Sequence, residues 1–206
     1  MPIALATPSL FTYYQAPPRL NHALVIGISQ SRQSQDIVSV VTEGHRQGCP
    51  TLAITNDTSS PLAKAADLVF DICAGEEKAV AASKTYTAQL AAIAMISAAL
   101  SGDPEMRRSL ERLPGWIEEV LAHDERLASL AERYRYMQQC VVLGRGYNYA
   151  TAYEWSLKIK ELTYAVADPY SPADFKHGPI ALVEPGFPIM AAAPGGMVFA
   201  DMLALL

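Results

Sequence analysis

Short runs rich in β-branched residues alternate along this chain with helix-like patterns. In the first half, four runs have the length and composition of strands: residues 2–6, 23–29 (ALVIGIS), 51–56 (TLAITN) and 68–73 (LVFDIC). Helical patterns cover residues 34–47 and 83–99. Such alternation is typical of parallel βαβ units, in which helices cover both faces of a sheet. The sequence therefore predicts an α/β fold.

The βαβ pattern restarts in the second half of the chain. Residues 140–146 (CVVLGRG) and 188–193 have the composition of strands, and residues 148–164 have a helical pattern between them. The runs ALVIGIS and CVVLGRG both lead from an apolar strand into a turn of small residues that opens a helix, which we interpret as a weak internal repeat. Two flavodoxin-like units are therefore expected, with helices on both faces of each sheet.

A charge-rich stretch separates the two expected units. It carries apolar residues at helix-like intervals, which predicts one or two amphipathic helices with a break near Pro114 and Gly115. The expected organisation is a first unit at residues 1–102, a helical connector at 103–136 and a second unit at 137–206. Because doubly wound sheets normally contain five or six strands, we expect both units to be incomplete at the ends of this chain.

Composition excludes several classes of protein. Half of the residues are apolar and 18% are charged, which excludes a disordered chain. The net charge of −5 is spread over both halves, and no basic stripe is present, so we expect no nucleic-acid partner. Residues 85–102 are uncharged but contain several hydroxyl and amide side chains, so we predict a buried helix there and no membrane association.

The cysteines and the N-terminus indicate a compartment. Cys49, Cys73 and Cys140 are an odd number, widely spaced and within apolar runs. This pattern favours buried thiols in a reducing compartment over disulfides or a metal site. Because no basic segment precedes an apolar one at the N-terminus, we expect no signal peptide and a cytoplasmic location.

The first candidate site is the hydroxyl-rich turn at residues 29–34 (SQSRQS), between an expected strand and an expected helix. Unpaired amides at a helix N-terminus, together with Ser29, Ser31 and Ser34, suit a phosphate group, and Arg32 could pair with it. The alternative is that Ser31 or Ser34 only caps the helix. A second polar loop, residues 75–85, enters the Ala-rich helix, where Ser83 and Thr85 could either cap it or face the same ligand.

Two further candidates lie in the second half. Glu154, Lys158 and Glu161 share one face of a helix, either as a solvated ion-pair ladder or as a general base, Glu161, tuned by Lys158. His177 precedes Gly-Pro in an expected loop, where catalytic groups are frequent, although a lone histidine is more often structural. No second His or Cys stands at a spacing that would indicate a metal site.

Together these segments resemble the sugar-isomerase (SIS) domain family, and in particular the tandem pair in the isomerase part of glucosamine-6-phosphate synthase and its stand-alone relatives. The matching segments are SQS-x-x-S at 29–34, AVAASKTYTAQL at 79–90, LGRG at 143–146, EWSLKIKEL at 154–162 and FKHGPIALV at 175–183. They follow the family's order and spacing over nearly the whole chain.

The resemblance implies a role for each site residue. It implies that the sugar phosphate is bound by a set of residues from the first half: Ser29, Gln30, Ser31, Ser34, Val80 and Ser83. It implies that Glu161, with Lys158 beside it, moves a proton between C1 and C2 of the sugar. It implies that His177 helps to open the sugar ring and comes from the neighbouring subunit, so that a homodimer is expected. It implies no metal and no organic cofactor.

Two residues depart from the family pattern. Arg32 replaces the usual Gly after SQS, and Ala82 stands where relatives have a ligand-facing Ser. The expected function is C1–C2 proton transfer on a hexose or hexosamine 6-phosphate, with deamination of glucosamine 6-phosphate to fructose 6-phosphate. The alternatives are the isomerase part of a glutamine–fructose-6-phosphate aminotransferase and a non-catalytic sugar-phosphate sensor.

Overall fold

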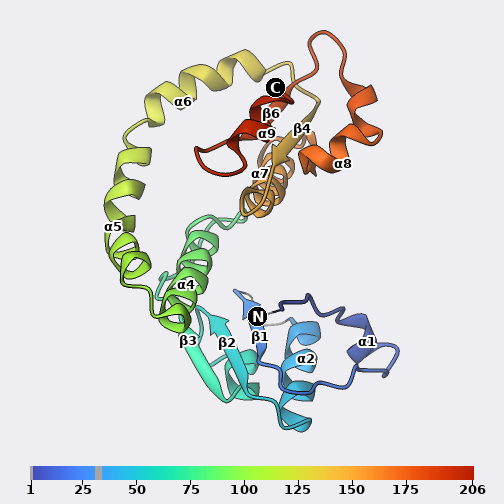
Figure 1. Ribbon diagram of the computed structural model, residues 1–206, viewed down its shortest axis with the longest axis vertical. Helices are drawn as coiled ribbons and strands as arrows, with labels where there is room; N and C mark the ends of the chain where they lie inside the picture. The colour runs from blue at the N-terminus through green and yellow to red at the C-terminus, as the bar shows by residue number, and fades with distance from the viewer. Residues whose placement is uncertain (1, 31–33) are drawn as a thin grey trace. The chain divides into compact units, whose positions relative to one another are not determined.

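The computed structural model describes residues 2–30 and 34–206 of the chain (Figure 1). The chain divides into two compact units, one ending at Ile117 and the other beginning at Glu118. Within the described residues, each unit is built around a three-stranded parallel sheet with helices packed on it. The predicted α/β class, with parallel sheets in two units, is therefore confirmed.

The first unit contains β1 (Val25–Ser29), β2 (Thr51–Thr55) and β3 (Leu68–Asp71), which pair in that order with all strands parallel. Its helices are α1, α2, α3 and α4, spanning Ser9–Thr12, Gln35–Arg46, Pro61–Ala65 and Lys84–Ser101. Strands β1, β2 and β3 and helices α2 and α4 were predicted from the alternating pattern, to within a few residues at their ends.

The core of this unit lies between the sheet and its helices. Val41 of α2, Ala53 of β2 and Leu62 of α3 are buried together on one face of the sheet. Ile54 points to the opposite face, because successive strand residues alternate, and it is fully buried where α4 contacts β2. Helices therefore cover both faces, and the carboxyl ends of all three strands meet at one edge.

The second unit has the strand order β5-β4-β6, again all parallel. The strands are β4 (Gln139–Gly144), β5 (Val166–Tyr170) and β6 (Ile189–Ala192). Four helices belong to this unit: α6, α7, α8 and α9, spanning Asp124–Ala131, Asn148–Thr163, Pro172–Lys176 and Phe199–Leu203. Two 3-10 turns span Glu132–Tyr134 and Pro179–Leu182.

Two apolar clusters fill the two faces of the second sheet. On one face, Ala152 and Ile159 of α7 pack on Cys140 and Val142 of β4. On the other, Val141 and Leu143 of β4 pack against Phe175 of α8 and Met202 of α9. Each fully buried large side chain contributes about 1.5–3 kcal/mol by leaving water. Strand β4, central and buried on both faces, therefore organises this unit.

The segment 2–6, strand β5 and helix α5 differ from the sequence predictions. Residues 2–6 form no strand, and Ile3 and Leu5 are almost fully exposed, because no neighbouring strand pairs with this segment among the described residues. Strand β5 was missed because it contains Pro169; within the described ranges β5 pairs only with β4, so it lies at the sheet edge, where a missing N–H is tolerated. The predicted break near Pro114 is absent, and α5 (Pro104–Leu121) continues through it.

The cysteines also correct one expectation. Cys49 and Cys140 are buried free thiols, as predicted. Cys73 is exposed, because β3 ends at Asp71 and Cys73 lies in the following loop, with a positive φ of 50°. In the part of the chain that the structure describes, no helix is both long and apolar enough to cross a membrane.

Candidate active site

The carboxyl end of β1 leads into the hydroxyl-rich turn. Ser29 is the last residue of β1 and is 8% exposed, and Gln30 follows it in a half-buried position. Ser34 is at the N-cap position of α2, and its side chain makes no capping hydrogen bond to the described residues. The predicted ligand Ser31 and the departure Arg32 lie outside the described residues. The described part of the turn therefore sits where a helix N-terminus favours an anion.

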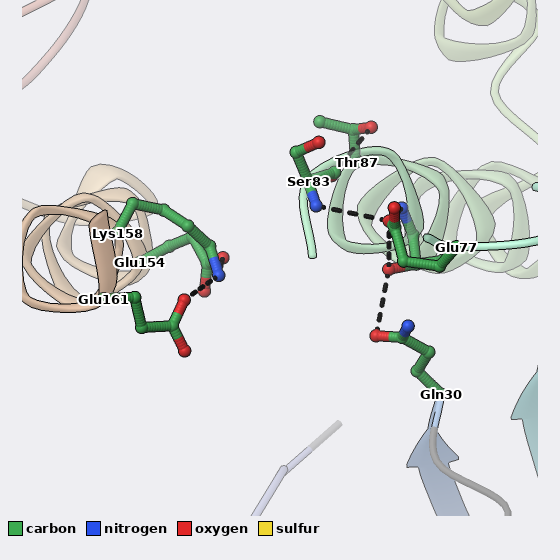
Figure 2. A network of polar contacts seen from close by, with 8 residues as sticks. Gln30, Glu77, Ser83, Thr87, Glu154, Lys158 and Glu161 are labelled. Atoms are coloured by element: carbon green, nitrogen blue, oxygen red, sulfur yellow. Dashed lines mark hydrogen bonds and ion pairs between the residues drawn. The ribbon is translucent and has the colours of Figure 1, made fainter. Parts of the chain in front are cut away.

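The polar loop before α4 is held by Glu77. Its Oε2 accepts hydrogen bonds from the Ser83 amide at 3.3 Å and the Thr85 amide at 3.4 Å, both at the N-terminus of α4 (Figure 2). Burial acts to raise the pKa of Glu77, but the hydrogen bonds that its carboxylate accepts, including those from the backbone amides of Thr85, Ala79 and Ser83, outweigh it, so the pKa lies below its ordinary value. Glu77 thus caps α4 as a carboxylate.

Thr85 connects this cap to Gln30 in the hydroxyl-rich turn after β1. Its side chain is 1% exposed, and its Oγ1 lies 3.2 Å from Oε2 of Glu77 and 3.1 Å from Oε1 of Gln30. Asn56, just after β2, ties down the start of the same loop. Its Nδ2 donates to the carbonyl of Gly75 at 2.6 Å, and its Oδ1 accepts from the amide of Ala74 at 3.0 Å. The loop after β3 is thereby hydrogen-bonded to Asn56, which follows β2, and through Thr85 to Gln30, which follows β1.

Val80 and Ser83 are both exposed, and Val80 is fully so. Ser83 is at the N-cap position of α4, but its hydroxyl makes no capping hydrogen bond among the described residues. The Ser83 hydroxyl therefore does not cap α4. The Glu77 carboxylate caps the helix instead. Ala82, the departure from the family pattern, is half-buried beside Ser83.

In the second unit, helix α7 is fixed closely on the sheet. A Cβ on Gly144, at the end of β4, would lie 2.0 Å from the carbonyl oxygen of Asn148, so only glycine allows the start of α7 to approach so closely. Farther along the helix, Ser156 is fully buried and its hydroxyl donates to the carbonyl oxygen of Ala167 in β5. This face of α7 is turned to the sheet.

The opposite side of α7 carries three charged side chains. Nζ of Lys158 lies 2.8 Å from Oε2 of Glu161 and 3.2 Å from Oε1 of Glu154, and the three side chains are only 20–33% exposed (Figure 2). Burial acts to lower the pKa of Lys158, but its hydrogen bonds to Glu161 and Glu154 outweigh it, so the pKa lies above its ordinary value. The structure therefore keeps a charged ammonium between two carboxyl groups.

His177 lies at the end of a short helix rather than in an open loop. It is the C-cap residue of α8, and its amide donates to the carbonyl of Asp174 at 3.1 Å. Ser171 begins this helix: its Oγ accepts from the amide of Asp174 at 3.2 Å and donates to the same residue's Oδ2 at 2.6 Å. Gly178, with φ of 144°, makes the turn that ends the helix. The His177 side chain is exposed.

Two groups of predicted residues are thus assembled within their own units. Lys158 and Glu161 are in direct contact, and Gln30 is linked to the N-terminus of α4 through Thr85. No hydrogen bond or ion pair joins His177 to Glu161 among the residues described. Glu77 was missed as a site residue because it lies six positions before Ser83; an acidic residue shortly before a polar helix start was the signal available.

A family model described as SIS domain matches residues 14–99 and 135–200. The glutamine–fructose-6-phosphate aminotransferase (isomerizing) of Methanosarcina acetivorans is 36% identical over 200 residues, which cover 93% of this chain and 32% of that protein. The same enzyme from Legionella pneumophila strain Paris is 39% identical over 178 residues, covering 84% of this chain and 30% of the relative.

Solved structures similar to this chain include proteins with the same kinds of name. A phosphosugar isomerase candidate from Silicibacter pomeroyi superposes with a TM-score of 0.91 and 36% identity, covering 100% of this chain and 62% of that one. The C-terminal domain of glucosamine-fructose-6-phosphate aminotransferase from Francisella tularensis gives 0.82 and 30%, covering 90% and 56%. This chain spans about a third of the aminotransferases that it matches.

Proposed function

The chain belongs to the SIS domain family, and from that premise we propose that it binds a hexose or hexosamine 6-phosphate and transfers a proton between C1 and C2 of the sugar. Its relatives at 30% identity or more are named as isomerising aminotransferases and as a phosphosugar isomerase candidate. Within this class we propose deamination of glucosamine 6-phosphate to fructose 6-phosphate as the specific reaction.

The observation that carries the proposal is the cluster of Glu154, Lys158 and Glu161 on α7. A general base must be a positioned group that can accept and return a proton, and carboxylates commonly serve this purpose. In the proposed reaction, Glu161 removes the C2 proton of the open-chain sugar and returns it to C1. Water then hydrolyses the resulting C2 imine, which releases ammonia and leaves the ketose.

Lys158 has a positioning role in this scheme. Its ammonium contacts both Glu154 and Glu161, so it restricts the rotamers available to the base. A sensor of sugar phosphates needs a phosphate-binding loop but has no use for a half-buried cluster of this kind. The cluster therefore favours an enzyme over the non-catalytic alternative.

The phosphate of the substrate is assigned to the turn after β1. Ser29, Gln30 and Ser34 stand between the strand end and the N-terminus of α2, where amide groups and the helix dipole favour an anion. We further propose that Ser31 and Ser83 contribute hydroxyls, that Val80 contributes its backbone, and that His177, from a second copy of the chain, assists ring opening.

The test is to incubate the full-length protein with glucosamine 6-phosphate and to measure ammonia and fructose 6-phosphate together. Equimolar release of the two supports the deaminase. Conversion of the sugar phosphate without ammonia supports an isomerase of another substrate in this class, and production of glucosamine 6-phosphate from fructose 6-phosphate and an ammonia donor supports the aminotransferase part. Binding without any turnover would leave the sensor and contradict the proposal.

A further inference from the structure

Glu77 has no assigned part in the proposed reaction, yet it is bound on one side to α4 and, through Thr85, to Gln30. Its Oε2 accepts hydrogen bonds from two amides of the first turn of α4, from Ser83 and Thr85. Among the described residues, the side chain of its neighbour Glu76 makes a single contact, a 4.0 Å ion pair with Lys78, and both of those side chains are more than 80% exposed. The two adjacent glutamates therefore differ sharply in what they contact.

The Thr85 hydroxyl has one proton and two neighbouring acceptors, at 3.2 Å in Glu77 and 3.1 Å in Gln30. The Glu77 oxygen is already served by two amides, which leaves the hydroxyl proton available to Oε1 of Gln30. Because Oε1 accepts from Thr85, the NH2 group of the same amide is left to donate to another partner. An NH2 group donates hydrogen bonds, which is what phosphate oxygens require.

We propose that Glu77 is a positioning residue for the substrate loop, and that it acts through Thr85 to hold the Gln30 amide with its NH2 group toward the sugar phosphate. This inference rests on the proposed function, because it concerns the same binding site. The alternative is that Glu77 only caps α4 and that its effect on Gln30 is incidental.

Thr85→Val separates these two roles. The substitution keeps the shape of a buried side chain and removes the hydroxyl, while the amides that bind Glu77 remain, so the cap on α4 is retained. Glu77→Ala removes the cap, and with it the acceptor that holds Thr85 in place through its amide. Glu76→Ala is the matched control, since it deletes a neighbouring carboxylate that contacts neither Thr85 nor Gln30.

We expect Thr85→Val and Glu77→Ala each to weaken the binding of glucosamine 6-phosphate, and to raise its KM, by about tenfold, the effect of losing about one oriented hydrogen bond. Changes in kcat should stay within about twofold. Glu76→Ala should match the wild type. In a Gln30→Ala background, neither Thr85→Val nor Glu77→Ala should weaken binding further, because the residue through which they act is gone.

Two results would overturn the inference: unchanged binding in Thr85→Val, or effects of full size in the Gln30→Ala background. If the wild-type protein binds no sugar phosphate, the proposed function fails, and NMR relaxation of the Gln30 side-chain NH2 group in the free protein decides the inference alone. The relay predicts an ordered NH2 group in the wild type and in Glu76→Ala and a mobile one in Thr85→Val. Equal mobility in all three contradicts it.

Discussion

Lys158 holds two carboxyl groups in place on the surface of helix α7. Its ammonium lies within 3.2 Å of carboxyl oxygens on both sides, in a setting where all three side chains are largely covered. A fully solvated ladder of this spacing contributes little and leaves its side chains mobile. Partial burial strengthens the interactions and limits the motion, which is what a proton-transfer group requires.

At the same scale, Glu77 predicts a pH dependence. Because its pKa in the folded protein lies below the value of 4.5 for a free glutamate, the folded state favours the carboxylate. Its contribution to the free energy of unfolding is therefore fully present above about pH 4.5 and is lost as the pH falls through the lower, folded-state pKa. We expect the stability difference between the wild type and Glu77→Gln to be largest near neutral pH and to shrink in acid.

Urea unfolding from pH 7 down to pH 3 measures this difference, with Glu76→Gln as the control. Glu76→Gln should follow the wild-type curve at every pH. A difference between the wild type and Glu77→Gln that stays constant across the range would show that the Glu77 carboxylate is not favoured by the fold.

Side-chain patterns made some residues predictable and left others hidden. The face shared by Glu154, Lys158 and Glu161 follows directly from helical spacing, so their contact could be anticipated. Glu77 could not be, because its contact with Thr85 depends on the course of an irregular loop. The position of His177 as the last residue of a short helix also depends on the local cap made by Ser171, which a loop-like composition conceals.

Among the elements, α7 is the one on which the account depends most, and its placement rests on Gly144. A methyl group there would meet the Asn148 carbonyl oxygen at 2.0 Å, and a backbone atom cannot turn aside as a side chain can. We expect Gly144→Ala to lower the stability of the second unit by about 3 kcal/mol, the upper end of the range for overpacking.

Hydrogen exchange of the β4 amides is the suitable readout, because it reports on this unit separately. The control is Gly115→Ala in α5, where the added methyl meets nothing within 4 Å. Alanine in a helix should there leave protection unchanged or raise stability by about 0.5–1 kcal/mol. Equal protection of β4 in Gly144→Ala and Gly115→Ala would contradict the close approach of strand and helix.

Elements were predictable where hydrophobic pattern and turn residues agreed. Strands β1, β2 and β4 are apolar runs ending in small or polar residues, and the structure has them within about two residues of the expected positions. The two proline positions led to opposite errors in the sequence predictions. Pro169 concealed an edge strand, and Pro114 suggested a break in α5 where the helix continues. In each case the tertiary context decides whether a missing N–H is tolerated.

At the scale of the whole molecule, both units contain an apolar strand that leads through a turn of small residues into a helix, but this strand has a different position in each sheet. Among the described residues, the strand of the first repeat, β1, pairs only with β2, whereas that of the second, β4, lies between two neighbours. The candidate groups are divided between the units: the turn that we propose to bind phosphate belongs to the first unit, and Lys158, Glu161 and His177 belong to the second.

The proposed sharing of His177 between subunits gives a prediction at this scale. Glu161→Gln and His177→Ala should each be inactive, but a mixed dimer has one site with both groups intact. Co-expression should restore about a quarter of the wild-type activity, because half of randomly formed dimers are mixed and each has one working site of two. Mixed dimers without activity, formed from two inactive parents, would place His177 in its own subunit's site, and an active His177→Ala parent would remove it from the mechanism.

The central claim is that Glu161 moves the proton between C1 and C2, and the exchange of the C2 hydrogen of glucosamine 6-phosphate with solvent deuterium tests it most directly. The full-length wild type and Glu125→Gln, a control on the exposed surface of α6, should catalyse exchange at the same rate. Glu161→Gln should bind the sugar phosphate with an affinity within about twofold of the wild type and show no exchange above the uncatalysed rate. Exchange at the wild-type rate in Glu161→Gln would contradict the account and return Glu161 to a structural ion pair with Lys158.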